Sequence, residues 1–131
     1  MNTIGTISSY HAHIYYDEAT RPTAAAIRDQ IAERFAVQMG HWRDVPVGPH
    51  VRAMYQVAFP VALFATLVPW LMLNRQGLTV LVHPNTDRPR DDHVLYPLWM
   101  GEILAVKEEV LRDARPDKEP VVPNTAPTVG L

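Results

Sequence analysis

Cysteine is absent from the chain of 131 residues. Its absence excludes disulfide bonds, thiolate metal ligands and a cysteine nucleophile. A strong charge of either sign is also missing, because the formal net charge is -2 at pH 7. The composition therefore gives no electrostatic reason to expect a partner among DNA, RNA or acidic lipid surfaces.

Sequence features that direct a chain to a membrane are scarce as well. Val57 to Leu73 carries no formal charge, but it falls short of the about 20 residues of a membrane span and contains Pro60 and Pro69. We interpret this stretch as the end of a buried strand followed by an apolar helix. Met1 to Ser9 has no basic region and no apolar run, so no secretory signal is visible and we expect a cytoplasmic protein.

What the chain does contain is enough apolar material for one core, because hydrophobic residues make up 47% of it. The patterning predicts a single domain over residues 1–114. Residues 115–131 are rich in proline and show little apolar periodicity, so we expect them to form a flexible tail.

The order of elements predicts the fold. Hydrophobic periodicity and turn residues indicate strands and helices in the order strand, helix, strand, strand, helix, strand. The predicted ranges are Tyr10–Tyr16, Pro22–Phe35, Val37–Val45, Val51–Phe59, Val61–Arg75 and Leu78–His83, followed by a polar loop at Asn85–Asp92 and a short third helix within Leu98–Leu111. This order is that of an α+β, ferredoxin-like βαββαβ sandwich with a four-stranded antiparallel sheet. Two helices leave one face of such a sheet uncovered, so we expect a homodimer.

In this fold, histidines that are distant in sequence converge. We expect the first strand to lie between the third, parallel to it, and the fourth, antiparallel to it. His11 and His13 then share one face near the start of the first strand. His50, just before the third strand, and His83, at the end of the fourth, arrive at the same end.

Such a convergence favours a metal site. A lone histidine on a strand is more often a surface or hydrogen-bonded residue, but a divalent metal needs about three ligands, and neutral imidazole suits Fe, Zn, Cu and Ni. Asp17, Asp92 and Glu102 are candidate carboxylates for a site with two histidines and one carboxylate. Spacing alone does not choose among them.

Several segments, in order, resemble one family. They are Tyr10–Asp17, Val47–His50, Met54–Phe59, Pro69–Arg75, Leu78–Pro84, Asp92–His93 and Leu98–Gly101. Together they resemble the DOPA 4,5-dioxygenase family, over about residues 8–105. The resemblance implies a non-haem Fe(II) enzyme that uses O₂ to open the ring of a catechol such as DOPA by extradiol cleavage.

The resemblance also implies roles for individual residues. It implies that the metal-site residues are His13, His50 and His83 and that the acid–base or substrate-orienting residues are His11 and His93. Two further residues are candidates for substrate binding. Tyr15 shares the face of His13, and Arg52 is placed to bind a substrate carboxylate.

Two other functions compete with the dioxygenase. A zinc hydrolase would use the same histidines to activate water, without redox chemistry. A non-catalytic ferredoxin-like dimer would bind a small aromatic ligand and would hold no metal.

Overall fold

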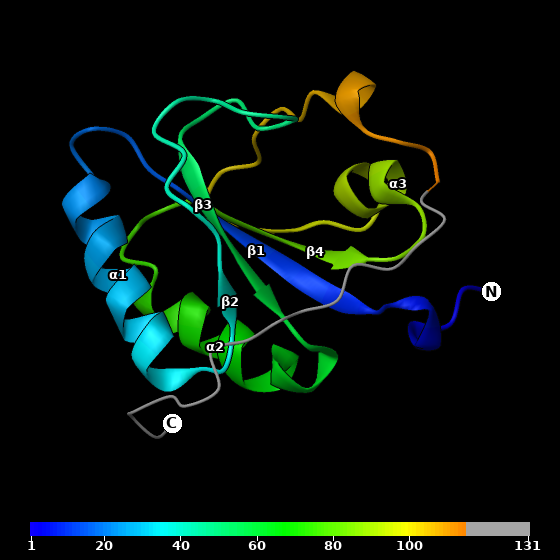
Figure 1. Ribbon diagram of the computed structural model, residues 1–131, viewed down its shortest axis with the longest axis horizontal. Coiled ribbons are helices and arrows are strands. Elements are labelled where there is room, and N and C mark those ends of the chain that lie inside the picture. Colours follow the sequence, from blue (N-terminus) through cyan, green and yellow to red (C-terminus); the bar gives the residue numbers. More distant parts are fainter. Residues whose placement is uncertain (115–131) are drawn as a thin grey trace.

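A computed structural model describes residues 1–114 (Figure 1). Its helices and strands are β1 (Ser9–Tyr15), α1 (Arg21–Arg34), β2 (Gln38–Met39), β3 (Met54–Phe59), α2 (Phe64–Asn74), β4 (Val80–Asn85), α3 (Pro89–Val94) and β5 (Leu98–Met100). Short 3-10 helices lie at Ile4–Thr6, Val61–Leu63 and Glu108–Val110. The tail expected at residues 115–131 lies outside the described residues.

The sheet has five strands in the order β2-β3-β1-β4-β5, and every neighbouring pair is antiparallel. The α+β class is confirmed, but the prediction of four strands is wrong. The fifth strand, β5, begins the range in which we expected a short helix, Leu98–Leu111, and the helix there is reduced to the 3-10 turn at Glu108–Val110. Pro97 disfavours a helical conformation for the residue before it, and Gly101 at φ 87° ends the strand in the left-handed region.

The predicted parallel pairing of the first and third strands is also wrong. Strand β3 runs antiparallel to β1, from Met54 opposite Tyr15 to Phe59 opposite Tyr10. Strand β2 pairs antiparallel with β3, so the β2–β3 hairpin reverses the chain before β3 begins. As a result, β3 starts beside the end of β1, away from His11.

Three other predicted boundaries shift. The weak strand expected over Val37–Val45 is reduced to the two residues of β2 and one bridge between Arg43 and Met54. The polar loop expected over Asn85–Asp92 contains the start of α3, because Pro89 lies at a first-turn position that proline favours. Strand β4 continues through Pro84 to Asn85.

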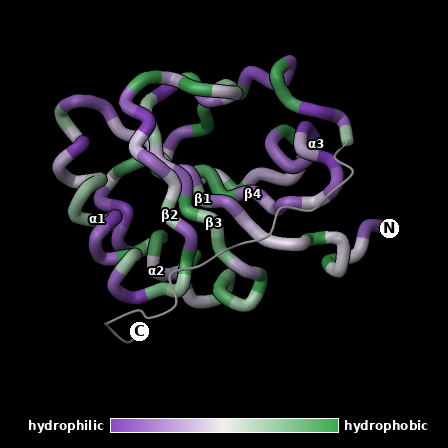
Figure 2. The backbone as a smooth tube through the Cα atoms, viewed as in Figure 1, coloured by the Kyte–Doolittle hydropathy of each residue, from purple (hydrophilic) through white to green (hydrophobic). Residues whose placement is uncertain are grey.

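The main hydrophobic core lies between the sheet and the two long helices, α1 and α2 (Figure 1). Even-numbered residues of β1, such as Ala12 and Ile14, face these helices. The helix α1 buries Ala24, Ile27 and Ile31, at helical spacing. Figure 2 shows hydrophobic residues along α2 and the turn before it, whereas hydrophilic residues alternate with hydrophobic ones along α1. Within the described residues, no helix has the length and apolar character needed to cross a membrane.

The opposite face of the sheet is covered by other parts of the chain. Helix α3 lies against it on the β4 side (Figure 1). Val47 and Leu104, from residues 43–53 and 101–111, pack onto a small cluster that includes Tyr15. We call residues 43–53 and 101–111 the covering segments. The backbone amide of Lys107 donates to the carbonyl of Pro49 at 2.9 Å, which joins the two segments over the sheet.

Candidate metal centre

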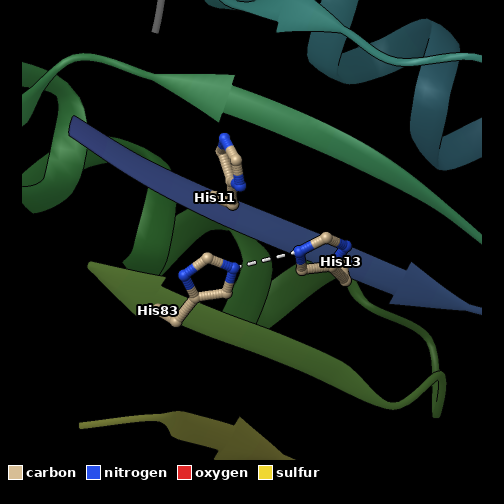
Figure 3. A group of neighbouring side chains, drawn as sticks. All are labelled: His11, His13 and His83. Carbon is tan, nitrogen blue, oxygen red and sulfur yellow. Dashed lines mark hydrogen bonds between the residues drawn. The ribbon is translucent and has the colours of Figure 1, made fainter. Parts of the chain in front are cut away.

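Five histidines gather on this face of the sheet. They are His11 and His13 on β1, His83 on β4, His50 in a covering segment and His93 on α3. His11 and His13 project from β1 onto the same face, and His83 on β4 is paired directly with His11 (Figure 3). The ring centroids of His83 and His93 are 4.0 Å apart, and those of His13 and His50 are 4.2 Å apart. The predicted convergence on this face is therefore present, although His50 reaches it through a covering segment.

Three of these imidazoles form a group that fits a metal ion. One ring nitrogen each from His11, His13 and His83 lies within 4.8 Å of the other two. The Nε2 atoms of His13 and His83 are 3.1 Å apart (Figure 3). Two nitrogens that bind one ion at about 2.1 Å and at a right angle would lie about 3.0 Å apart. The separation therefore suits two neighbouring ligands of one metal.

Backbone carbonyls determine the tautomers of two rings. His83 Nδ1 lies 2.9 Å from the carbonyl oxygen of Pro84, and His93 Nδ1 lies 2.7 Å from that of Pro89. A carbonyl only accepts, so both Nδ1 atoms must carry the proton. In the neutral ring the lone pair is then on Nε2, which for His83 faces His13. A carbonyl that accepts from the second nitrogen in this way is the usual support of a metal-binding histidine.

Burial keeps these histidines uncharged. The pKa of His13 and that of His83 are well below the ordinary value, first because burial disfavours the charged ring and then because other histidines lie nearby. Burial and the neighbouring His93 lower the pKa of His50 to about 4. At neutral pH the three rings are therefore neutral and do not need to lose a proton to bind a metal.

One buried atom of the group lacks a partner. His13 Nδ1 has no hydrogen-bond partner among the described residues, although the side chain is only 2% exposed. Leaving a buried polar atom unpaired costs about 1–3 kcal/mol, and such atoms in a folded protein often mark functional sites. A cation bound at Nε2 would leave this Nδ1 unpaired, so the fit of a cation rests on the approach of the ring nitrogens and not on the orphaned atom.

The candidate carboxylates do not join the three-imidazole group. Asp92 is the nearest of them to the histidines, and it borders the same small cavity as His11 and His93. Both of its oxygens accept from Thr86, at 2.8 Å from the amide and 2.6 Å from the hydroxyl. Asp92 therefore ties α3, which carries His93, to the end of β4.

The other two carboxylates lie elsewhere. Asp17 is exposed and accepts from Thr20. Glu102 forms an exposed ion pair with Arg52, with a nitrogen–oxygen distance of 2.7 Å. This pair borders another pocket, whose lining includes Tyr15 but none of the histidines.

The two predicted substrate-binding residues thus differ in position. Tyr15 faces the histidine side of β1, is 3% exposed, and lies with its hydroxyl oxygen 2.7 Å from His50 Nδ1. Arg52 lies outside the cluster. The structure brings Tyr15 to the site and leaves Arg52 beside Glu102.

Among residues 1–114, cavities border the histidine cluster on two sides. A small one of about 40 Å³ is lined by His11, His83 and His93, and we call it the inner cavity. A larger one of about 340 Å³ is lined by residues that include His41, Arg43, His50 and Gln56, and we call it the outer pocket. Pockets for small organic ligands start at roughly 300 Å³, whereas a single water occupies roughly 30 Å³. The outer pocket can thus hold a small ring compound, and the inner cavity can hold little more than a water-sized molecule.

Sequence reasoning missed two residues of the outer pocket. Gln56 lies opposite His13 on β3 and shares its side of the sheet. The alternation of residues along β3 shows which of them share a face with Gln56, but only the antiparallel register with β1 places Gln56 beside His13. For Arg43, which falls in the weak strand predicted over Val37–Val45, the sequence favours a solvated strand end over a position facing a substrate. The structure instead puts it on the pocket wall as the one formally charged lining residue.

The fold and the cluster define an α+β protein with a histidine-lined candidate metal centre. A model of the Dopa 4,5-dioxygenase family matches residues 10–110, and the chain belongs to this family. A "DOPA 4,5-dioxygenase" from Amanita muscaria is 31% identical over 104 residues, which are 72% of this chain and 46% of that protein. This chain therefore matches just under half of the Amanita protein.

Two further relatives extend the comparison. An "Uncharacterized 21.2 kDa protein" from Botryotinia fuckeliana is 31% identical over 127 residues, which are 87% of this chain and 69% of that protein. A solved structure of a "putative dioxygenase" from Nostoc punctiforme is 48% identical, with a TM-score of 0.83. That match covers 84% of this chain and 96% of the Nostoc chain. The family and the solved structure together support an oxygenase enzyme.

Proposed function

We propose that this protein is a non-haem Fe(II) extradiol dioxygenase that opens the ring of a catechol such as DOPA. The observation that carries the proposal is the group of three buried imidazoles from His11, His13 and His83. Membership of the Dopa 4,5-dioxygenase family supports the choice of a dioxygenase over other reactions of a histidine-bound metal. In this reaction one O₂ is consumed for each catechol, and both of its atoms enter the ring-opened product.

The three imidazoles would hold the iron in this proposal. His11 replaces His50 in the ligand set that the sequence implied, because the nitrogens of His11, His13 and His83 are the ones that converge. Fe(II) would supply the activation of O₂ that side chains alone do not provide. Neutral imidazoles are suitable ligands for iron, although zinc, copper and nickel accept them as well.

The protein's own residues bind and orient the substrate. A catechol would occupy the outer pocket, with its ring beside His50 and Gln56. Arg43 gives this pocket a positive charge, and no described residue forms an ion pair with it. A catechol with a carboxylate on its side chain therefore fits the pocket better than a neutral one. The buried position of His13 and His83 excludes bulk water from the reacting atoms.

The test is anaerobic reconstitution with Fe(II), followed by oxygen uptake and visible absorbance on a panel of catechols. We expect a yellow ring-opened product and oxygen uptake with Fe(II), and neither with Zn(II). His13→Ala and His83→Ala should lose both iron and turnover. His41→Ala is the matched control for iron content alone, because His41 is exposed and outside the metal group but lines the outer pocket.

Other outcomes would direct the function elsewhere. Full turnover and full iron content in both His13→Ala and His83→Ala would refute the proposed site. Hydrolysis with Zn(II) and no oxygen uptake would favour a zinc hydrolase. A protein that takes up no metal would be a binding module with this fold.

A further inference from the structure

Tyr15 and His50 form a buried pair whose role the fold and the metal group leave open. The tyrosine hydroxyl and His50 Nδ1 are 2.7 Å apart, and the two residues are 3% and 5% exposed. Tyr15 lies at the end of β1, the central strand of the sheet, whereas His50 comes from a covering segment. The hydrogen bond is therefore a polar connection between the sheet and that segment, at the edge of the histidine cluster.

The direction of this hydrogen bond follows from the surroundings of the hydroxyl. No other described residue forms a hydrogen bond with the Tyr15 hydroxyl. If His50 donated to it, the buried hydroxyl proton would be left without an acceptor, which costs about 1–3 kcal/mol. A phenol has an ordinary pKa of about 10, so the hydroxyl carries a proton at neutral pH. The hydroxyl thus donates, and His50 Nδ1 accepts.

We infer that Tyr15 is a positioning residue that holds His50 as the Nε2–H tautomer, so that His50 is a hydrogen-bond donor to the ligand of the outer pocket and not a metal ligand. This tautomer is the opposite of that of His83, whose Nδ1 donates to the carbonyl of Pro84. His50 and His83, two rings of one cluster, therefore differ in the group that each has at Nε2. His83 offers a lone pair at Nε2, and His50 offers an N–H group.

The location of His50 agrees with this division. It lines the outer pocket, and it lies outside the group of three imidazoles whose nitrogens converge. A donor at this position suits a ligand that carries oxygen atoms, such as a catechol. The donor role toward a substrate rests on the proposed dioxygenase function, but the tautomer does not.

The tautomer is tested by NMR on metal-free protein labelled with ¹⁵N in histidine. His50 should show a protonated Nε2 and an unprotonated Nδ1 in long-range ¹H–¹⁵N spectra at pH 7, with the signals assigned by their loss in His50→Gln. Tyr15→Phe should weaken this preference and shift His50 toward a mixture of tautomers. A proton on Nδ1 of His50 in the unmodified protein would overturn the inference.

Tyr16→Phe is the matched control for Tyr15→Phe. Tyr16 is the next residue, is 5% exposed, and donates its hydroxyl to Asp44 on the other side of the strand. Both variants lose one hydrogen-bonded hydroxyl, so both should show similar decreases in Tm. Only Tyr15→Phe should change the His50 spectrum, and an equal change in Tyr16→Phe would refute a specific role for Tyr15.

Activity measurements with Fe(II) separate the inference from the proposed function. Tyr15→Phe should lower kcat/KM about tenfold, with unchanged iron content. His50→Gln, which keeps an N–H donor, should retain more activity than His50→Leu. Loss of iron in these His50 variants would identify His50 as a ligand and overturn the inference. If the spectra agree but the unmodified protein consumes no oxygen with any catechol, the positioning role stands and the dioxygenase proposal fails.

Discussion

Mild acid should destabilise the metal-free protein steeply, because three histidines are buried without charge. The folded-state pKa values of His13, His50 and His83 lie below the ordinary value of about 6.5. The unfolded chain therefore binds more protons than the folded chain below pH 6.5. The stability from these histidines is present above that pH and is lost as the pH falls through it.

The magnitude follows from the number of buried rings. Each ring that stays neutral in the folded state costs up to about 1.4 kcal/mol per pH unit below its unfolded pKa. For three rings, integration from pH 7 to pH 5.5 gives a loss of about 4 kcal/mol. Total stabilities of small domains are about 5–15 kcal/mol, so this loss is a large fraction. Asp92, whose pKa is raised by burial, contributes the opposite sign at lower pH, and the range therefore ends at 5.5.

Urea unfolding followed by tryptophan fluorescence, with EDTA present, measures this dependence. The slope of unfolding free energy against pH should fall by about a third in His83→Gln, and His41→Gln should leave it unchanged. The slope is compared, and not the stability itself, so a variant that is merely less stable still gives an answer. A stability that is constant from pH 7 to 5.5 would refute the burial of neutral histidines.

Three further predictions concern single residues. Asp92→Asn should lower the free energy of unfolding by about 1–2 kcal/mol, because the side-chain nitrogen of asparagine cannot accept one of the two hydrogen bonds from Thr86. Equal stability of the two proteins in urea unfolding would contradict this prediction. Arg43→Gln should raise KM about 3- to 10-fold for a carboxylated catechol and leave KM for a neutral catechol unchanged. The control, Arg52→Gln, should change neither KM. Both variants are measured by steady-state oxygen uptake. Gly101→Ala should lower the free energy of unfolding by about 1–2 kcal/mol or more, because φ is 87° and the added Cβ would lie 3.0 Å from a guanidinium nitrogen of Arg75. A Tm equal to that of the unmodified protein would show that the turn adjusts.

Local periodicity predicted the parts of the site that lie on single strands. Alternation along β1 placed His11, His13 and Tyr15 on one face, and the structure has them there. Helical spacing located α1 to within one residue at each end. These features depend on neighbouring residues alone, which the sequence displays directly.

The features that depend on the path of the chain were not predictable in this way. The direction of β3 follows from its hairpin with β2, a strand of only two residues that carries almost no sequence signal. The contact of His50 with Tyr15 requires a loop to fold back over the sheet. Strand β5 is three residues long and gains its pairing only from the edge of β4. Long-range pairing selected these conformations over the local preferences.

The division of the site between strands and loop has a consequence for how such proteins diversify. The three convergent imidazoles come from two hydrogen-bonded central strands, whereas much of the wall of the outer pocket comes from residues 40–50, which join β2 to β3. Substitutions in a connecting segment disturb a sheet far less than substitutions in its central strands. New ligand preferences are therefore accessible by exchange of residues 40–49, with His50 retained, while the candidate metal centre stays intact. The same separation makes residues 40–49 the natural region to randomise when altered selectivity is sought.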